Sequence, residues 1–162
     1  MAGNPTWPEA ARGGARYNDR MADLQPTMIT EAVREVLGGT SVFLVYAHGS
    51  RIRGDARPDS DLDLGYYALG DGRHACMDLA SELGFSGALS DVLGCEVDLR
   101  CLAIAPLQVR GRVLEEGIRV YCSDEEARVD LERDLLGRYH DYKPKFEEWR
   151  RLRIESAARQ GQ

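Results

Sequence analysis

The sequence predicts an α/β domain of about four strands flanked by helices. Short runs of β-branched and aromatic residues alternate with segments in which apolar residues recur at helical spacing, and a further helical stripe occupies the end of the chain. With 162 residues, of which 43% are hydrophobic, the chain can bury one core of useful size. Nothing in the pattern indicates a second domain.

The first part of the chain predicts an extension, one helix and two strands. Residues 1–24 are rich in Gly, Pro, Ala and Arg without helical or strand periodicity, which predicts a disordered extension before a domain spanning 25–160. Helical spacing predicts a helix over 28–37, which the glycines at 38 and 39 would end. β-branched and aromatic residues predict a strand over 41–47, and alternation predicts another over 61–68.

The middle of the chain continues this alternation. A helical stretch is predicted from about His74, with a break near Gly84 to Gly87. Clean alternation predicts a third strand over 95–102. A helix over 106–116, closed by Gly117, and a short fourth strand over 118–122 complete the sheet.

A long helix is predicted at the C-terminal end. Ser123 can cap it, and the three acidic residues that follow suit a helix N-terminus. Its apolar stripe, which continues beyond Pro144, consists of Leu131, Leu135, Tyr139, Tyr142, Phe146, Trp149 and Leu152. A stripe at this spacing predicts core packing, although Tyr, Trp and Arg in this tail also suit a partner surface.

A Gly-Ser pair followed by an acidic pair indicates phosphate and metal chemistry. Gly49 lets backbone amides approach a phosphate, and Ser50 adds a hydroxyl donor. Asp61 and Asp63 alternate with leucines, so in a strand both carboxylates would face one way. Two hard oxygen ligands on one face suit Mg²⁺, which usually takes one or two carboxylates plus substrate phosphates.

Other phosphate or metal motifs do not fit this segment. A Walker A loop would need Lys and Ser or Thr directly after Gly54, where Asp and Ala stand. An EF-hand loop starting at Asp59 would need Gly at position 64 and Glu at position 70, where Leu and Gly stand. An ordinary polar turn is the remaining alternative, but a turn does not require two carboxylates in a strand, where Asp is depleted.

A third carboxylate is expected nearby, because displacement at phosphorus is commonly run with two metal ions. Asp98 is the candidate, since it lies on the polar face of the alternating segment 95–101. The competing interpretation is a solvated strand face in which Asp98 pairs with Arg100 or with nothing.

Composition narrows the class of protein. The net charge of -6 argues against direct nucleic-acid binding. The chain has no apolar run of 18 residues and no signal-peptide core at its start, so we expect no membrane contact and a cytoplasmic location. The cysteines lack metal-ligand spacing and are expected to be small buried hydrophobes; they are Cys76, Cys95, Cys101 and Cys122.

The motif resembles that of polymerase-beta-type nucleotidyltransferases, and among them the minimal nucleotidyltransferases (MNT). The similarity lies in Gly49-Ser50, the Asp-X-Asp pair at 61–63 and the Arg-Pro-Asp-Ser run at 57–60. The order of elements, the Leu-Glu-Glu-Gly turn at 114–117 and the Arg-Tyr-His-Asp-Tyr-Lys-Pro run at 138–144 are similar to the antidote half of HEPN/MNT toxin–antitoxin pairs. The resemblance covers about residues 28–151 and implies a small mixed sheet with a long C-terminal helix.

The resemblance also implies roles for individual residues. The triphosphate of ATP would be held by Gly49, Ser50, Arg51 and Ser60. Asp61 and Asp63 would bind Mg²⁺, and Asp98 would complete the site as a metal ligand or as the base that receives the nucleophile's proton. The arginines at 51, 53 and 57 could stabilise the leaving pyrophosphate, and the sequence does not decide among them. His48 is interpreted as a structural histidine at a strand end.

The implied function is transfer of AMP from ATP to a tyrosine of a HEPN ribonuclease toxin, which silences the toxin. The partners would be the cognate HEPN toxin and ATP. Two alternatives stay open. One is transfer to a small hydroxyl compound such as an aminoglycoside, which would need an additional substrate domain. The other is a non-catalytic antitoxin whose long C-terminal helix occludes the toxin.

Overall fold

The computed structural model describes residues 24–54, 60–70 and 75–160, and a four-stranded mixed sheet lies at its centre. The strands are β1 (Val42–His48), β2 (Leu62–Ala68), β3 (Val97–Cys101) and β4 (Ile118–Cys122), in the order β3-β2-β1-β4. β1 runs antiparallel to β2 and β4, whereas β2 and β3 are parallel. The predicted mixed sheet of about four strands is therefore confirmed.

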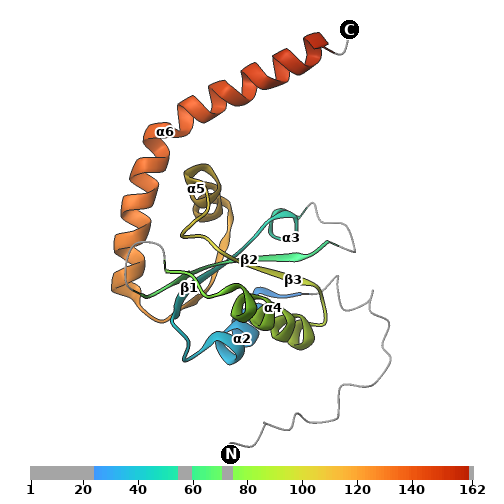
Figure 1. The fold of residues 1–162 in the computed structure, drawn as a ribbon, viewed down its shortest axis with the longest axis vertical. Helices are drawn as coiled ribbons and strands as arrows, with labels where there is room; N and C mark the ends of the chain where they lie inside the picture. The colour runs from blue at the N-terminus through green and yellow to red at the C-terminus, as the bar shows by residue number, and fades with distance from the viewer. Residues whose placement is uncertain (1–23, 55–59, 71–74, 161–162) are drawn as a thin grey trace, which may run out of the picture.

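Helices cover both faces of this sheet (Figure 1). They are α2 (Pro26–Leu37), α3 (Ser50–Arg53), α4 (Leu79–Leu93), α5 (Leu107–Glu116) and α6 (Glu125–Gln160). α2 and α4 lie side by side and cover one face, while α5 lies on the other face and is flanked by α6. The predicted extension lies outside the described residues except for Leu24, which packs against the core. Within the described residues, no helix has the length and apolar content needed to cross a membrane.

Alternation along β2 assigns its side chains to these two helical layers. Leu62, Leu64 and Tyr66 are fully buried, and the Tyr66 hydroxyl donates a hydrogen bond to Glu82 of α4 at 2.8 Å. The intervening residues therefore point to the α5 face, because successive side chains in a strand alternate. Tyr67 accordingly reaches Arg110 of α5. Asp63 shares this α5 face.

The helix before β3 differs from the sequence-based prediction. α4 begins at Leu79, where the Asp78 carboxylate accepts a hydrogen bond from the Ser81 amide at 2.9 Å, and His74 lies outside the described residues. The break expected near Gly84 to Gly87 is wrong, since α4 continues through both glycines. Each glycine costs a helix about 1 kcal/mol relative to alanine, which packing of the helix against β3 and α2 offsets.

The cysteines also depart from expectation. Cys76 and Cys101 form a disulfide, with Cα atoms 5.8 Å apart, so their interpretation as simple buried hydrophobes is wrong. The bond ties the segment before α4 to the end of β3, a contact between residues 25 positions apart that no local pattern could reveal. Cys95 is a buried free thiol, as predicted, and Cys122 is free and partly buried.

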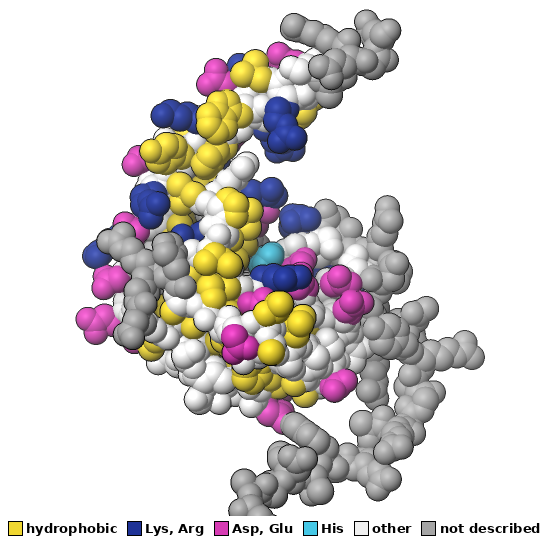
Figure 2. All heavy atoms as spheres, in the orientation of Figure 1, with side chains coloured by type: hydrophobic (Ala, Val, Ile, Leu, Met, Phe, Trp, Pro, Cys, Tyr) yellow, Lys and Arg dark blue, Asp and Glu magenta, His cyan; other side chains and the backbone are white. Residues whose placement is uncertain are grey.

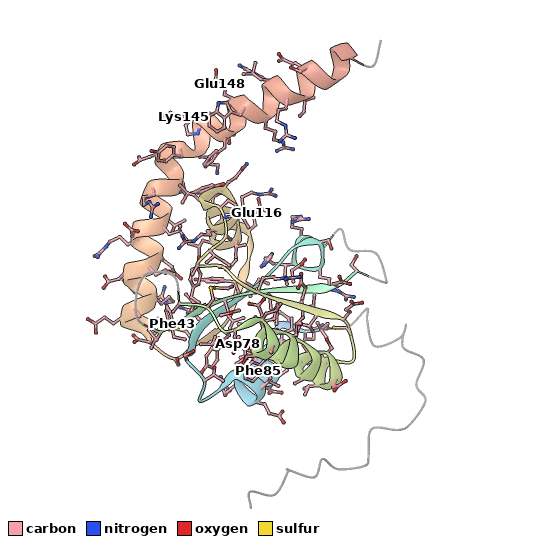
Figure 3. The ribbon with its side chains drawn as sticks, in the orientation of Figure 1. Phe43, Asp78, Phe85, Glu116, Lys145 and Glu148 are labelled. Atoms are coloured by element: carbon pink, nitrogen blue, oxygen red, sulfur yellow. A yellow bond between two sulfur atoms is a disulfide. The ribbon has the colours of Figure 1, made fainter. Side chains whose placement is uncertain are left out.

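α6 has two halves that behave differently. The first half packs on the domain: Leu135 and Tyr139 are buried, and a Cβ built on Gly111 of α5 would lie 2.1 Å from the Tyr139 ring. The helix changes direction in the region of Pro144 (Figures 1 and 3), because proline cannot donate the helical hydrogen bond. Tyr142, just before Pro144, is 48% exposed, and Trp149, beyond it, is 61% exposed. The predicted core packing is therefore correct only for the part of the stripe that ends at Tyr139.

Candidate active site

The register of the sheet brings three polar residues into one row. His48 of β1 is paired with Asp63 of β2, and Asp63 is paired with Asp98 of β3. Residues directly opposite each other in neighbouring strands point to the same face of the sheet. The two acidic residues, 35 positions apart in sequence, therefore lie side by side on the face that α5 partly covers.

Gly49 brings the backbone against this row. Its φ of 82° lies in the left-handed region that favours glycine, and it directly precedes the short helix α3, in which Ser50 is the first residue. A Cβ built on Gly49 would lie 2.0 Å from Oδ2 of Asp63. The chain thus passes closely over the carboxylate, and any side chain at position 49 would displace it.

Arg51 ties α3 to the start of the acidic strand. Its guanidinium donates hydrogen bonds to the backbone carbonyl of Ser60, from Nε at 2.6 Å and also from Nη2. Asp61 is exposed and directly precedes β2, which begins at Leu62, one residue later than predicted. The contact shown for Arg51 is with backbone, so its assignment to the nucleotide, like that of Ser60, stays a prediction.

Burial and crowding of charge shift the pKa of two groups in the row. Burial raises the pKa of the Asp63 carboxyl above its ordinary 3.8, and the negative charges of Asp98 and Asp61 raise it further, whereas His48 opposes the shift. Burial lowers the pKa of the His48 imidazole, and the nearby carboxylates oppose that shift. The ionised form of Asp63 is therefore destabilised, and a bound cation would stabilise it by offsetting the burial and the neighbouring negative charges.

Asp98 has a partner of its own. Its carboxylate accepts a hydrogen bond from Nε of Arg100 at 2.7 Å in a half-exposed ion pair, the pairing that the competing interpretation of this strand names. Within the part of the chain described, no three His, Cys, Asp or Glu side chains converge as a ready cation site. Mg²⁺ normally takes one or two carboxylates and completes its shell with phosphates and water, so the two acids at positions 61 and 63 fit this ion.

A cavity of about 310 Å³ opens beside the row, between the Gly-Ser turn and α5. It is lined by His48, Gly49, Arg53, Gln108, Val109, Arg112, Val113 and Glu116. The α5 residues were not predicted from the sequence. Gln108, Arg112 and Glu116 repeat at intervals of four, a spacing that the sequence contains but that is also typical of a solvated helix face. Figure 3 places Glu116 on α5 above the sheet.

The fold and this site place the chain in a known class of enzymes. The model of the family described as "Polymerase beta, Nucleotidyltransferase" matches residues 31–126, which include the Gly-Ser turn and all three acidic residues. The chain belongs to this nucleotidyltransferase family. A search of curated proteins gives no match.

Several solved structures with the same fold come from toxin–antitoxin complexes. A chain from a toxin–antitoxin complex with AMP-PNP has a TM-score of 0.59 and 18% identity, over 83% of this chain and 99% of that one. A chain from the tri-AMPylated Shewanella oneidensis HEPN toxin in complex with MNT antitoxin has a TM-score of 0.57 and 15% identity, over 83% and 99%. A chain from an MntA-HepT complex has a TM-score of 0.56 and 15% identity, over 81% and 97%. At these identities the similarity concerns the fold.

Proposed function

We propose that the chain is a magnesium-dependent nucleotidyltransferase that moves AMP from ATP to a tyrosine of a cognate HEPN toxin, acting in the cytoplasm as the antitoxin. The observation that carries this proposal is the pairing of Asp63 with Asp98 directly beneath Gly49, in a chain of the nucleotidyltransferase family. The fold shared with chains of toxin–antitoxin complexes, one of which contains an AMPylated HEPN toxin, supports the choice of acceptor.

The reaction exchanges one phosphorus–oxygen bond for another. The tyrosine oxygen bonds to the α-phosphorus of ATP, the bond from that phosphorus to the oxygen bridging the β-phosphate breaks, and pyrophosphate leaves. Asp61 and Asp63 would hold Mg²⁺, which neutralises phosphate charge when bound. Little covalent chemistry is left to the protein, which must position the two reactants.

The side chains of the site have distinct tasks in this proposal. Gly49 and Ser50 present backbone and hydroxyl donors to the triphosphate, and Arg53 adds positive charge in the adjoining cavity. Arg51 would hold the segment before β2 in place through the Ser60 carbonyl while contacting the nucleotide. Asp98 is half-exposed, so as the base it could receive the tyrosine proton and pass it to water.

Growth rescue and mass spectrometry together test the proposal. A HEPN protein, to be sought in the neighbouring reading frame, is co-expressed with the wild-type chain or with the Asp61→Asn, Asp63→Asn double variant. The wild type should restore growth and add one or more AMP masses to a toxin tyrosine. The double variant should still bind the toxin but neither protect nor modify it, because its two metal-binding carboxylates are gone.

A control separates chemistry from loss of charge. Asp91→Asn, Asp130→Asn removes two exposed carboxylates from α4 and α6 and should behave as the wild type.

The exposed second half of α6 favours one rival function, protection by occlusion alone. Rescue by the Asp61→Asn, Asp63→Asn variant at wild-type expression, without a mass shift on the toxin, would establish occlusion and reject catalysis.

A further inference from the structure

A groove runs between α5 and the second half of α6, and we call it the α5–α6 groove. It consists of three adjoining cavities. The first is the cavity of about 310 Å³ beside Gly49, the second measures about 320 Å³ and the third about 460 Å³. Figure 2 shows the molecule hollowed between the projecting helix and the rest of the domain, with Lys and Arg side chains at the edges of the hollow.

Shared lining residues make these cavities one path. Gln108, Arg112 and Glu116 line both the first and the second cavity. Phe146 and Arg150 line both the second and the third, in which Gln108 also takes part. The path therefore leads from the Gly-Ser turn, along α5, to the far half of α6.

One stripe of α6 forms the outer wall. Phe146, Trp149, Arg150, Arg153 and Ile154 line the third cavity, and their spacing of three and four residues places them on one side of the helix. The wall is held near α5 by Glu115, whose carboxylate accepts hydrogen bonds from Lys143 at 2.9 and 3.0 Å and also contacts His140. The groove is thus anchored at its middle and open at its far end.

Two arginines of this wall have no acidic partner among the described residues. Arg150 and Arg153 form no ion pair with any described residue, whereas other cations in this region of α6 do have partners. Lys143 pairs with Glu115, Arg151 approaches Glu155 at 3.9 Å, and Lys145 lies over the Tyr142 ring. Two unpaired guanidinium groups beside Trp149, on a chain whose net charge is -6, suit a partner surface that is both acidic and apolar.

Resting on the function proposed above, we infer that the α5–α6 groove is the docking surface of the toxin protein that accepts AMP. An acidic and apolar face of that protein lies along the stripe at 146–154. Docking there directs the acceptor tyrosine along α5 to the Gly49 end of the groove, where the α-phosphate is attacked. The groove thereby sets the affinity for the protein acceptor, separately from the affinity for ATP.

A second copy of this chain is a weaker candidate for the same surface. In a two-fold dimer the same patch meets itself, which would place the unpaired arginines of both copies together. Repulsion between them disfavours that arrangement. An acidic acceptor has no such penalty.

Charge reversal on the stripe tests the inference. Arg150→Glu, Arg153→Glu should raise KM for the proposed HEPN acceptor by 10-fold or more in an AMP-transfer assay. KM for ATP should stay within 2-fold. The matched control is Lys145→Glu, Arg151→Glu, which makes the same change of charge on the same half of α6 but off the stripe, and it should alter KM for the acceptor by less than 3-fold. Circular dichroism verifies that both variants keep the helix.

Three other outcomes would overturn the inference. Equal effects of the two variants would indicate general charge steering, and a rise in KM for ATP alone would assign the groove to the nucleotide. Dissociation of a wild-type dimer by the stripe variant, seen in sedimentation, would make the surface a self-interface. If the wild type transfers no AMP at all, the proposed function fails instead. Calorimetric titration of the HEPN protein into both variants then still tests docking, since only the stripe variant should lose binding.

Discussion

The Asp63 carboxylate lies so close to the backbone of Gly49 that the two positions cannot both carry ordinary side chains. A Cβ at Gly49 would be 2.0 Å from Oδ2 and 2.9 Å from Cγ of Asp63. Glycine at this position therefore serves two needs, a positive φ and the room for a carboxylate.

Gly49→Ala should abolish transfer and lower stability, because the new methyl group displaces Asp63. The matched control is Gly54→Ala, since Gly54 has the same φ of 82° but nothing within 4 Å of its Cβ position. Both variants carry the backbone strain of about 1 to 2 kcal/mol. Only Gly49→Ala should lose transfer, in single-turnover assays with the HEPN acceptor. Equal loss in both would trace the effect to backbone strain alone.

Asp63→Asn should reduce transfer by about 100-fold or more, because it removes a proposed metal ligand. Loss of the residues that merely support such a ligand already costs about 10- to 100-fold. Without added Mg²⁺ it should not lower stability. The folded pKa of Asp63 is raised, so ionisation of the wild-type carboxyl costs stability as pH rises from 3.8 through the raised value. Urea titrations at several pH values give the free energy of unfolding. Across that pH window it should rise for the variant relative to the wild type. A difference that does not change with pH would contradict the raised pKa of Asp63.

Asp98→Ala should slow single-turnover transfer by about 100-fold while ATP affinity changes little, since a base acts chiefly in the transition state. Arg100→Ala is the control for their ion pair, which is half-exposed and worth about 0 to 1 kcal/mol. It should leave transfer within a few-fold of the wild type. A loss of ATP binding equal to the loss of rate would instead make Asp98 a ligand of the ground state.

Gly111→Ala should destabilise the domain by about 1 to 3 kcal/mol, because a Cβ there would enter the Tyr139 ring and push α6 from α5. Gly84→Ala makes the same chemical change in α4, where nothing lies within 4 Å, and should be neutral or stabilising by up to about 1 kcal/mol. Urea unfolding of both variants measures the difference. Similar values for the two would show that α6 does not pack closely at Gly111.

Cys76→Ala should lower stability by about 3 kcal/mol under oxidising conditions, since it removes a cross-link between residues 25 positions apart. Cys122→Ala, which alters a free thiol, should change stability far less. In a reducing buffer Cys76→Ala and the wild type should have nearly the same free energy of unfolding. Intact mass before and after reduction, with alkylation of free thiols, reports directly whether the bond is present.

The sequence by itself determined the sheet, the helices that flank it and the family motif, because alternation, helical spacing and turn residues are local properties. It also indicated Asp98 as a candidate, since its alternating segment resembled the family's third acidic strand. It could not show that Asp63 and Asp98 are paired, that Cys76 meets Cys101, or that α4 continues through its glycines. Each of these depends on contacts between residues far apart in the chain.

The two halves of α6 show this division most clearly. The sequence contains one apolar stripe along the helix, and periodicity alone predicts core packing for all of it. The tertiary structure buries Tyr139 against Gly111 but leaves Trp149 exposed beyond Pro144. Whether a stripe is buried depends on whether a surface lies opposite it, and that is decided by where the sheet and α5 end, which no pattern within the helix records.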